Sequence, residues 1–152
     1  RGRHAPVWPA MTAAVYFVVT GKPTGKGRPR ASTRGGFVRM YTDAKTLGYE
    51  AAIADEAARA MGKMEPFETP MQMQVSCYYP IPKSWSKKKQ QDAVDGELYP
   101  KVKPDLDNVA KAVLDAINGV VYVDDAQVIN LVATKRYATD PRVEVYVFEK
   151  LK

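Results

Sequence analysis

Four carboxylates surround one short predicted helix between Lys103 and Asp125, and they constrain the fold more than any other feature of the sequence. Asp105 and Asp107 precede the helix, whereas Asp124 and Asp125 follow a short apolar segment after it. The chain is otherwise basic, with a formal net charge of +6. Acidic groups that gather on such a protein repel one another unless a cation lies between them. We therefore expect the fold to bring these acids into one pocket that presents a divalent metal ion to a polyanion.

The spacing around Asp107 suggests what the pocket does. If residues 105–107 are extended, Asp105 and Asp107 point the same way, and Asp107 begins a helix whose dipole favours negative charge. Lys111 follows at i+4 on the same helical face, where it would stabilise charge developing on a phosphate or orient an attacking water. Asp115, a further four residues on, is expected to lie too far along the helix to join the site.

Carboxylates in this number fit a hard divalent ion, which takes a few of them and keeps positions open for water and phosphate oxygens. Taken alone, the Asp-x-Asp pattern is better explained by helix capping from one residue and exposure of the other. Asn108, Lys111 and the Asp124–Asp125 pair reverse that preference. The sequence leaves open which of Asp124 and Asp125 touches the metal, and whether one or two ions act. The predicted metal ligands are Asp105, Asp107, Asp124 and Asp125.

Basic residues gather in two loops and indicate a phosphate-bearing partner. The segment from Lys22 to Arg39 carries six cations and no acid. A second cluster, at 87–89, follows Trp85 inside a long connection from Pro80 to Pro104, where lysines could clamp a backbone and the indole could stack on a base. Solvated loops are the alternative in both cases. The predicted DNA-binding residues are Lys22, Lys26, Arg28, Arg30, Arg34, Lys87, Lys88, Lys89 and Lys103.

Other chemistries are excluded by what the chain lacks. Its only cysteine is Cys77 and its only histidine is His4, so a Cys-rich zinc site or a triad built on histidine is not expected. A chain without disulfides fits a reducing, cytoplasmic compartment. No apolar run approaches the roughly 20 residues of a membrane span. Residues 1–10, which precede Met11, are interpreted as a leader outside the folded domain.

Hydrophobic patterning predicts an α+β domain with a single mixed β-sheet flanked by two main helices. Thr42 or Asp43 caps the first helix and Gly62 ends it, while Gly119 ends the second. Ser84 or Ser86 could cap a further short helix in the long connection. The predicted elements are strands at 13–20, 37–41, 71–79, 120–123, 127–136 and 142–150, and helices at 43–61 and 107–118.

Three packing details also follow from the pattern. The first helix is expected to bury a flat face, and the strand at 71–79 to be half-buried, with Cys77 on its apolar side. The turn at 138–141 suggests that the last two strands form a hairpin. The helical face expected to be buried consists of Leu47, Ala51, Ala54, Ala58 and Met61.

The segment from Lys103 to Ala116, with Asn118-Gly119 and 123–128, resembles the RusA-type Holliday junction resolvases of bacteria and their phages. Its motif here reads Lys-Pro-Asp-Leu-Asp-Asn-Val-Ala-Lys, followed by Val-Asp-Asp-Ala-Gln. The Ser-Trp-Ser-Lys-Lys-Lys block at 84–89 is similar to phage members. The resemblance implies one RusA-like nuclease domain over residues 11–152, acting as a homodimer on four-way DNA junctions in recombination and repair.

The same resemblance implies dependence on Mg²⁺, with Mn²⁺ as a substitute, and a catalytic set comprising Asp105, Asp107, Lys111 and Asp125. Two other classes remain open on the residues alone. One is a nucleic-acid-binding module without catalysis, in which the aspartates cap helices. The other is a nucleotidyl or nucleotide-sugar transferase, for which the chain is short and lacks the usual Gly-rich phosphate loop.

Overall fold

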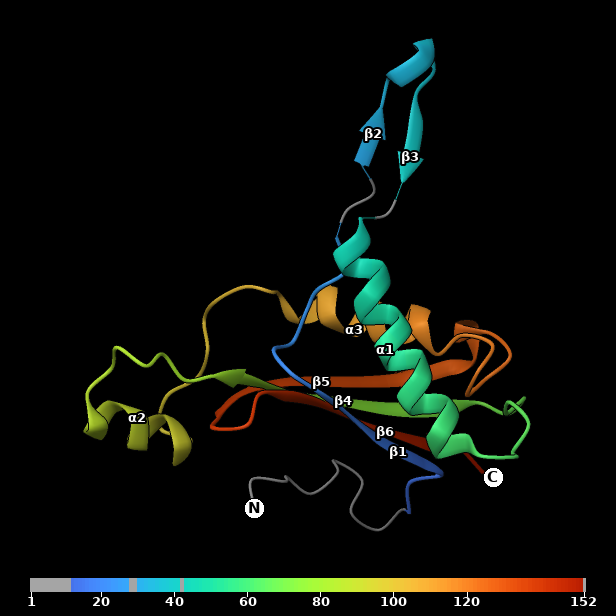
Figure 1. Ribbon diagram of the computed structural model, residues 1–152. Helices are drawn as coiled ribbons and strands as arrows, with labels where there is room; N and C mark the ends of the chain where they lie inside the picture. Colours follow the sequence, from blue (N-terminus) through green and yellow to red (C-terminus); the bar gives the residue numbers. More distant parts are fainter. Residues whose placement is uncertain (1–11, 28–29, 42, 152) are drawn as a thin grey trace.

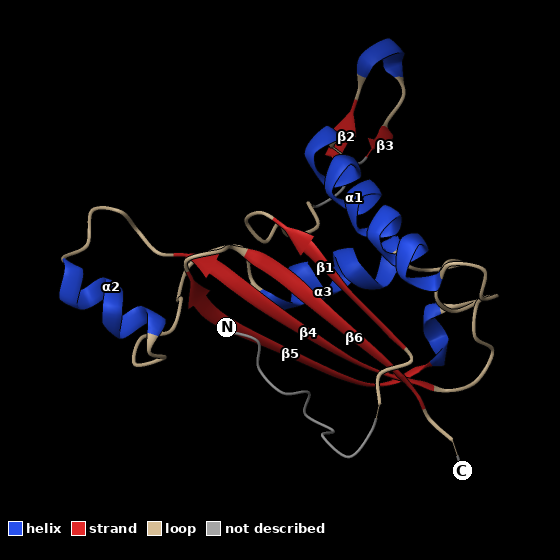
Figure 2. Ribbon diagram, turned by 60° about the horizontal axis from the view of Figure 1, so that its bottom comes forward, coloured by secondary structure: helices blue, strands red, loops and turns tan. Residues whose placement is uncertain are grey.

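The computed structural model describes residues 12–27, 30–41 and 43–151, and its centre is a four-stranded mixed sheet (Figure 1). The strands are β1 (Val15–Thr20), β4 (Met71–Pro80), β5 (Val128–Ala138) and β6 (Arg142–Glu149), in the spatial order β1-β6-β4-β5. β6 is antiparallel to both neighbours, whereas β4 and β5 are parallel. Helices α1 (Ala44–Met61) and α3 (Leu106–Ala116) cover one face (Figures 1 and 2). The predicted α+β class is confirmed.

Helix α1 begins and ends where its capping residues predict, but it buries a different face. The Asp43 carboxylate accepts a hydrogen bond from the Thr46 amide at 2.7 Å, and Gly62, at φ 58°, closes the helix. The buried residues are Thr46, Ile53, Ala57 and Met61. Leu47, expected to be buried, is 56% exposed, and Ala51 and Ala58 are exposed too. Alanines on several sides of a helix fit more than one apolar stripe, and Ile53 decides which one packs.

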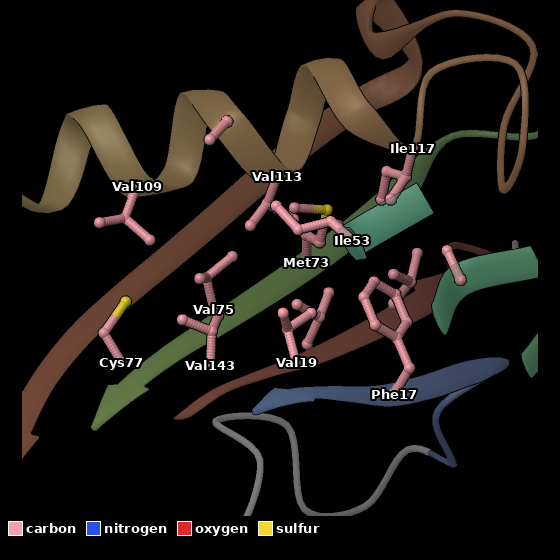
Figure 3. Close-up of a cluster of buried hydrophobic side chains, with 14 of the residues drawn as sticks. Phe17, Val19, Ile53, Met73, Val75, Cys77, Val109, Val113, Ile117 and Val143 are labelled. Atoms are coloured by element: carbon pink, nitrogen blue, oxygen red, sulfur yellow. The ribbon is translucent and has the colours of Figure 1, made fainter. Parts of the chain in front are cut away.

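The core lies between the two helices and the sheet. In Figure 3, Ile53 from α1 and Val109, Val113 and Ile117 from the α3 segment lie over side chains of β1, β4 and β6. Cys77 is 1% exposed, so its prediction as a core residue is confirmed. The expectation that β4 is half-buried is wrong, because its residues on both faces are buried from Met71 to Tyr79.

The predicted hairpin of the last two strands is also wrong. β5 and β6 follow each other closely in the chain, yet β4 lies between them and pairs with both. A strand buried on both faces is most stable at the centre of a sheet. The turn at 138–141 therefore connects two strands that both pair with β4 and not with each other.

Two excursions, an arm and a short helix, extend beyond this two-layer body. Strands β2 (Arg30–Ser32) and β3 (Arg39–Tyr41) form an antiparallel arm that projects from the start of α1 (Figure 1), joined by the 3-10 turn η1 (Arg34–Gly36). Helix α2 (Lys87–Val94), capped by Ser86, lies beyond the end of the sheet. β2, η1 and the exact start of β3 were not predicted. The leader assigned to residues 1–10 lies outside the described residues, as do His4 and Arg28.

Within the described ranges, no helix has both the length and the apolar character needed to cross a bilayer.

A buried ion pair on the sheet face opposite the helices gives the fold a testable weak point. The Arg142 Nε lies 2.7 Å from Glu144 Oε2, and the Glu144 side chain is 2% exposed. Arg142→Met would leave that carboxylate buried without its cation, which costs about 3 kcal/mol of unfolding free energy. Chemical denaturation measures the loss.

The exposed pair Arg59–Glu56, at 2.6 Å, supplies the matched control. Arg59→Met is expected to change the unfolding free energy by less than about 0.5 kcal/mol, because solvent screens such pairs. Equal effects of the two substitutions would show that the burial of Glu144 does not matter.

Candidate active site

Three hydrogen bonds from different parts of the fold fix the acidic segment before α3. The Tyr79 hydroxyl, at the end of β4, donates a hydrogen bond to the Pro104 carbonyl. The Lys135 ammonium, on β5, donates to the Val102 carbonyl at 2.7 Å. On the other side, the Lys26 amide donates to the Asn108 carbonyl at 3.0 Å. Residues 102–108 therefore have a fixed path across the end of the sheet, although their own sequence forms no strand.

Asp105 and Asp107 enter the site through the start of α3. Asp105 is the N-cap residue with extended backbone, but its side chain makes no capping hydrogen bond. Asp107 is the second residue of the helix, so residues 105–107 are not the extended segment that would point both side chains the same way. Both side chains are exposed, and Lys111 is 65% exposed one turn later. The explanation of Asp-x-Asp as simple capping thus does not account for Asp105.

The turn after α3 folds back along that helix and carries the second acidic pair. The Tyr122 hydroxyl donates to the Leu114 carbonyl at 2.9 Å, and Phe67 and Val121 are hydrogen-bonded through their backbones. Val121 and Tyr122 are fully buried. The segment 120–123 was expected to be a β strand, but it is a turn with isolated bridges only, because its residues serve to anchor the turn.

Asp124 and Asp125 have different surroundings. Asp124 caps the 3-10 turn η2 (Asp125–Gln127): its carboxylate accepts from the Ala126 amide at 3.2 Å, and the Gln127 side chain accepts from the Asp124 amide at 2.9 Å. Asp125 has no such capping role. The adjacent Asp124 carboxylate, which can share a proton with it, raises the pKa of Asp125, and burial and the charge of Asp115 raise it further. Lys111 acts in the opposite direction.

Asp115 lies next to the candidate site, closer to it than was expected from its place along the helix. Its Oδ2 is 3.9 Å from the Lys111 ammonium, and its charge acts on Asp125. Asp107, Lys111 and Asp115 follow one another at i, i+4 and i+8, so they form one row about 12 Å long on α3. The spacing was visible in the sequence; the turn that brings Asp125 beside the far end of the row was not.

The donor set suits a hard divalent ion, because it consists of carboxylates alone. In the part of the chain that the structure describes, however, no three Asp, Glu, His or Cys side chains lie close enough to hold one ion together. Mg²⁺ is commonly held by one or two protein carboxylates, with water and substrate phosphate completing its shell. The residues therefore fit a metal whose coordination is finished by the substrate, and they do not form a closed cage.

A pocket of about 370 Å³ opens beside Asp105, between the loop from Gly21 to Gly27 and the first turns of α1 and α3. Four lysines line it: Lys22, Lys45 and Lys103 are exposed, whereas Lys26 is partly buried. Lys45 was not predicted as a DNA-binding residue. The pocket gives the acidic segment a cationic neighbour.

The remaining predicted DNA-binding residues are placed as follows. Lys26 was expected to be exposed to solvent. It instead forms ion pairs with Asp115 at 2.7 Å and Glu50 at 3.4 Å. Lys87, Lys88 and Lys89 form the exposed first turn of α2. The backbones of Arg30 and Arg34 lie on the arm, and Arg28 is outside the described residues.

Trp85 is packed, which argues against its use as a stacking platform. Its ring meets Tyr137 edge-on at 5.4 Å, and the Lys89 ammonium lies 4.1 Å from its centre. The contact with Tyr137 of β5 holds the segment that bears α2 against the end of the sheet, and the contact with Lys89 lies within that segment. The indole therefore supports the lysines of α2.

Gly25 lets the basic loop approach the acidic segment, and its replacement tests that contact. A Cβ at this position would lie 2.9 Å from Asn108 Cβ and 3.0 Å from Pro104 Cβ. Gly25→Ala must displace the loop or the start of α3, so we expect a loss of about 1–3 kcal/mol in unfolding free energy. Chemical denaturation checks this.

The control is Gly48→Ala, inside α1, where an added Cβ meets nothing within 4 Å. That substitution is expected to stabilise the protein by up to about 1 kcal/mol, because alanine is the better helix former. A Gly25→Ala protein as stable as the Gly48→Ala protein would mean that the loop does not rest on α3.

Comparison with known sequences agrees with this geometry. A protein from Bacillus subtilis (strain 168), named "Uncharacterized protein YqaN", is 43% identical over 138 residues, which cover 89% of this chain and 96% of that protein. The sequence model of the family described as Endodeoxyribonuclease RusA matches residues 20–148. That match includes the basic loop, α3 and the Asp124–Asp125 turn. The chain therefore belongs to the RusA endodeoxyribonuclease family.

Proposed function

We propose that the protein is a metal-dependent endodeoxyribonuclease that resolves four-way (Holliday) DNA junctions by paired phosphodiester hydrolysis in opposing strands, in recombination and repair. The observation that carries the proposal is the row on α3, with the exposed Asp107 and Lys111 one turn apart, together with the turn that bears Asp125, which the Tyr122–Leu114 hydrogen bond fixes to the end of that helix. Membership in the RusA family supports the same activity.

The proposed metal ligands come from the carboxylates of Asp105, Asp107 and Asp125, with one or two of them binding an ion and water and phosphate completing its shell. Asp125 is preferred over Asp124, because the Asp124 carboxylate already caps η2. Mg²⁺ held there, or Mn²⁺ in its place, would supply a Lewis acid for the activation of water and the stabilisation of the leaving oxygen. Lys111 contributes a cation for the charge that develops on the phosphate, and its exposure leaves it accessible to DNA.

The lysine-lined pocket beside Asp105 is the proposed path of the DNA backbone towards the acids. A phosphate there meets Lys22, Lys45 and Lys103 within one space. The exposed lysines of α2 extend the cationic surface along the duplexes. A homodimer would present two such sites to one junction, as symmetric cleavage requires.

Lys103→Ala tests the path of the backbone. If Lys103 neutralises one phosphate, its loss should weaken junction binding and reduce the salt dependence of the affinity by about one unit of slope. Cleavage at saturating protein should stay near the wild-type rate. Binding measured by fluorescence anisotropy between 50 and 200 mM salt provides the slope, and an unchanged slope would remove Lys103 from the interface.

The activity itself is tested on a synthetic four-way junction with each strand labelled in turn. With Mg²⁺ we expect paired nicks at symmetric positions, and with EDTA none. Linear duplex of the same sequence serves as the control substrate. Failure to cut the junction with either Mg²⁺ or Mn²⁺ would contradict the proposal.

The second candidate is a nucleic-acid-binding module without catalysis. It is favoured by one observation, that no three described carboxylates converge on a common point. It predicts salt-dependent DNA binding that ignores divalent ions. A calcium titration that changes neither the DNA affinity nor the melting temperature would favour this candidate over the nuclease.

A further inference from the structure

Lys26 contacts the acidic side of the active site and so has a position unlike that of the other cations in its loop. Its ammonium lies 2.7 Å from Asp115 Oδ2 and 3.4 Å from Glu50 Oε1. Its amide is bonded to the Asn108 carbonyl, at the foot of α3. The side chain is 21% exposed, whereas Lys22 in the same loop is exposed. Contact with DNA would require Lys26 to leave two carboxylates.

Two ammonium groups approach the same oxygen of Asp115. Lys26 makes a hydrogen-bonded ion pair with Oδ2 at 2.7 Å, and Lys111 lies 3.9 Å from that atom. The attraction between unlike charges grows as they approach, and it is screened less where water is partly excluded. Asp115 is 27% exposed and Lys111 65% exposed. Lys26 therefore holds the carboxylate, and Lys111 remains the looser, more accessible cation.

We propose that Lys26 is a positioning residue that occupies Asp115 and thereby leaves the Lys111 ammonium available to the DNA phosphate. The proposal rests on the function proposed above. Without Lys26, the Asp115 carboxylate has one cation left on the same helical face. Lys111 then closes onto it through an i,i+4 pair, which is a favourable helical spacing, and the phosphate loses that cation.

Glu50 explains why Lys26 can be held without depending on Asp115 alone. It supplies a second carboxylate from α1, with its side chain 18% exposed. If Asp115 loses its charge, Lys26 keeps an ionic partner and the loop stays docked, while the competitor of Lys111 disappears. Loss of the Lys26 charge should therefore slow cleavage more than loss of the Asp115 charge.

A double-mutant cycle on Lys26 and Asp115 distinguishes this proposal from a direct DNA contact by Lys26 and from a catalytic role of Asp115. Lys26→Met should lower the single-turnover cleavage rate at saturating protein about tenfold, since one charged contact to the reacting phosphate is weakened. Junction affinity should stay within about threefold of wild type. Asp115→Asn alone should keep the rate within about threefold, and Lys26→Met with Asp115→Asn should recover it.

The matched control is Lys22→Met, a change of the same kind in the same loop. Because Lys22 is proposed to meet DNA directly, its loss should weaken binding and reduce the salt slope without slowing cleavage at saturation. If Lys26→Met behaves in this way and Asp115→Asn does not rescue it, Lys26 is a DNA contact and the proposal is wrong. Inactive Asp115→Asn would place Asp115 in the chemistry itself and would equally overturn the proposal.

Chemical labelling of Lys111 tests the effect of Lys26 on that residue without DNA. Once Lys111 closes onto Asp115 through the i,i+4 pair, its amine is less accessible to a reagent. Acylation of the Lys111 amine, followed by mass spectrometry, should therefore be about threefold slower in Lys26→Met and restored in the double variant. Lys26→Arg, which keeps the cation and the fold, should label as wild type. Unchanged Lys111 labelling in Lys26→Met would overturn the proposal. If no protein cuts DNA, the nuclease assignment fails, and the labelling still decides the role of Lys26.

Discussion

Asp107→Asn is expected to abolish junction cleavage, with a loss of at least about 10³-fold in the single-turnover rate, because a proposed metal ligand loses its charge. Asp107 lies exposed in the first turn of α3, so no core contact is lost. The helix dipole loses a favourable neighbour, which costs about 0.3–1 kcal/mol. Junction affinity should be unchanged or slightly higher, since a negative charge next to the phosphates is removed. Parallel cleavage and anisotropy assays measure both.

Asp55→Asn, on the exposed side of α1, is the matched control for this experiment. It makes the same chemical change on a helix and should leave both assays at wild-type values. Loss of binding together with cleavage in Asp107→Asn would contradict the assignment. It would show that Asp107 supports the DNA-binding surface and has no separate role in hydrolysis.

The second large effect is expected for Lys111→Ala. A cation that acts mainly on the charge of the transition state contributes to the rate far more than to binding. We therefore expect the rate to fall about 10²–10³-fold, while junction affinity changes by less than about threefold. The variant should fold normally, because the lysine side chain is 65% exposed. Rate and affinity are measured on the same labelled junction.

Lys63→Ala, an exposed lysine just after α1, controls for the loss of one positive charge. It should leave the cleavage rate unchanged. If Lys111→Ala instead weakens binding as much as it slows cleavage and reduces the salt slope by about one, Lys111 is an ordinary phosphate contact.

Local signals in the sequence were sufficient for both ends of α1 but not for the end of α3, which was predicted at Asn118 and lies at Ala116. Asp43 and Gly62 bound α1, and Ser86 caps α2, because each satisfies backbone groups only a few residues away. The α3 helix begins one residue before its predicted start, since Asp105 and not Leu106 is the cap. Capping contacts join residues that are close in the chain, so helix boundaries of this kind can be predicted from the sequence alone.

Contacts between distant segments were not predictable in the same way. The hairpin expected at 138–141 is replaced by two pairings with β4, which depend on the burial of β4 on both faces. The buried face of α1 depends on Ile53 meeting the sheet, and nothing in the alanine-rich pattern selects it. In both cases the tertiary environment decides among local alternatives that are nearly equal.

The candidate site shows the same division. The row of Asp107, Lys111 and Asp115 could be read from its spacing, although Asp115 was set aside. The role of Lys26 could not, because its partners are 24 and 89 residues away in the chain. A lysine in a glycine-rich basic loop looks like a phosphate contact until the fold shows two carboxylates around it.

The place of β6 in the sheet has a consequence for the order in which the protein can assemble during translation. β1 pairs with β6 from Val15↔Val147 onwards, and β6 alone joins β1 to β4. A ribosome releases residues 142–149 last among these strands, so β1 waits unpaired while the rest of the domain emerges. Until β6 is added, the sheet on which α3 packs is incomplete. We therefore expect the growing chain to lack a complete sheet, and with it the proposed nuclease activity, until the last strand has been synthesised.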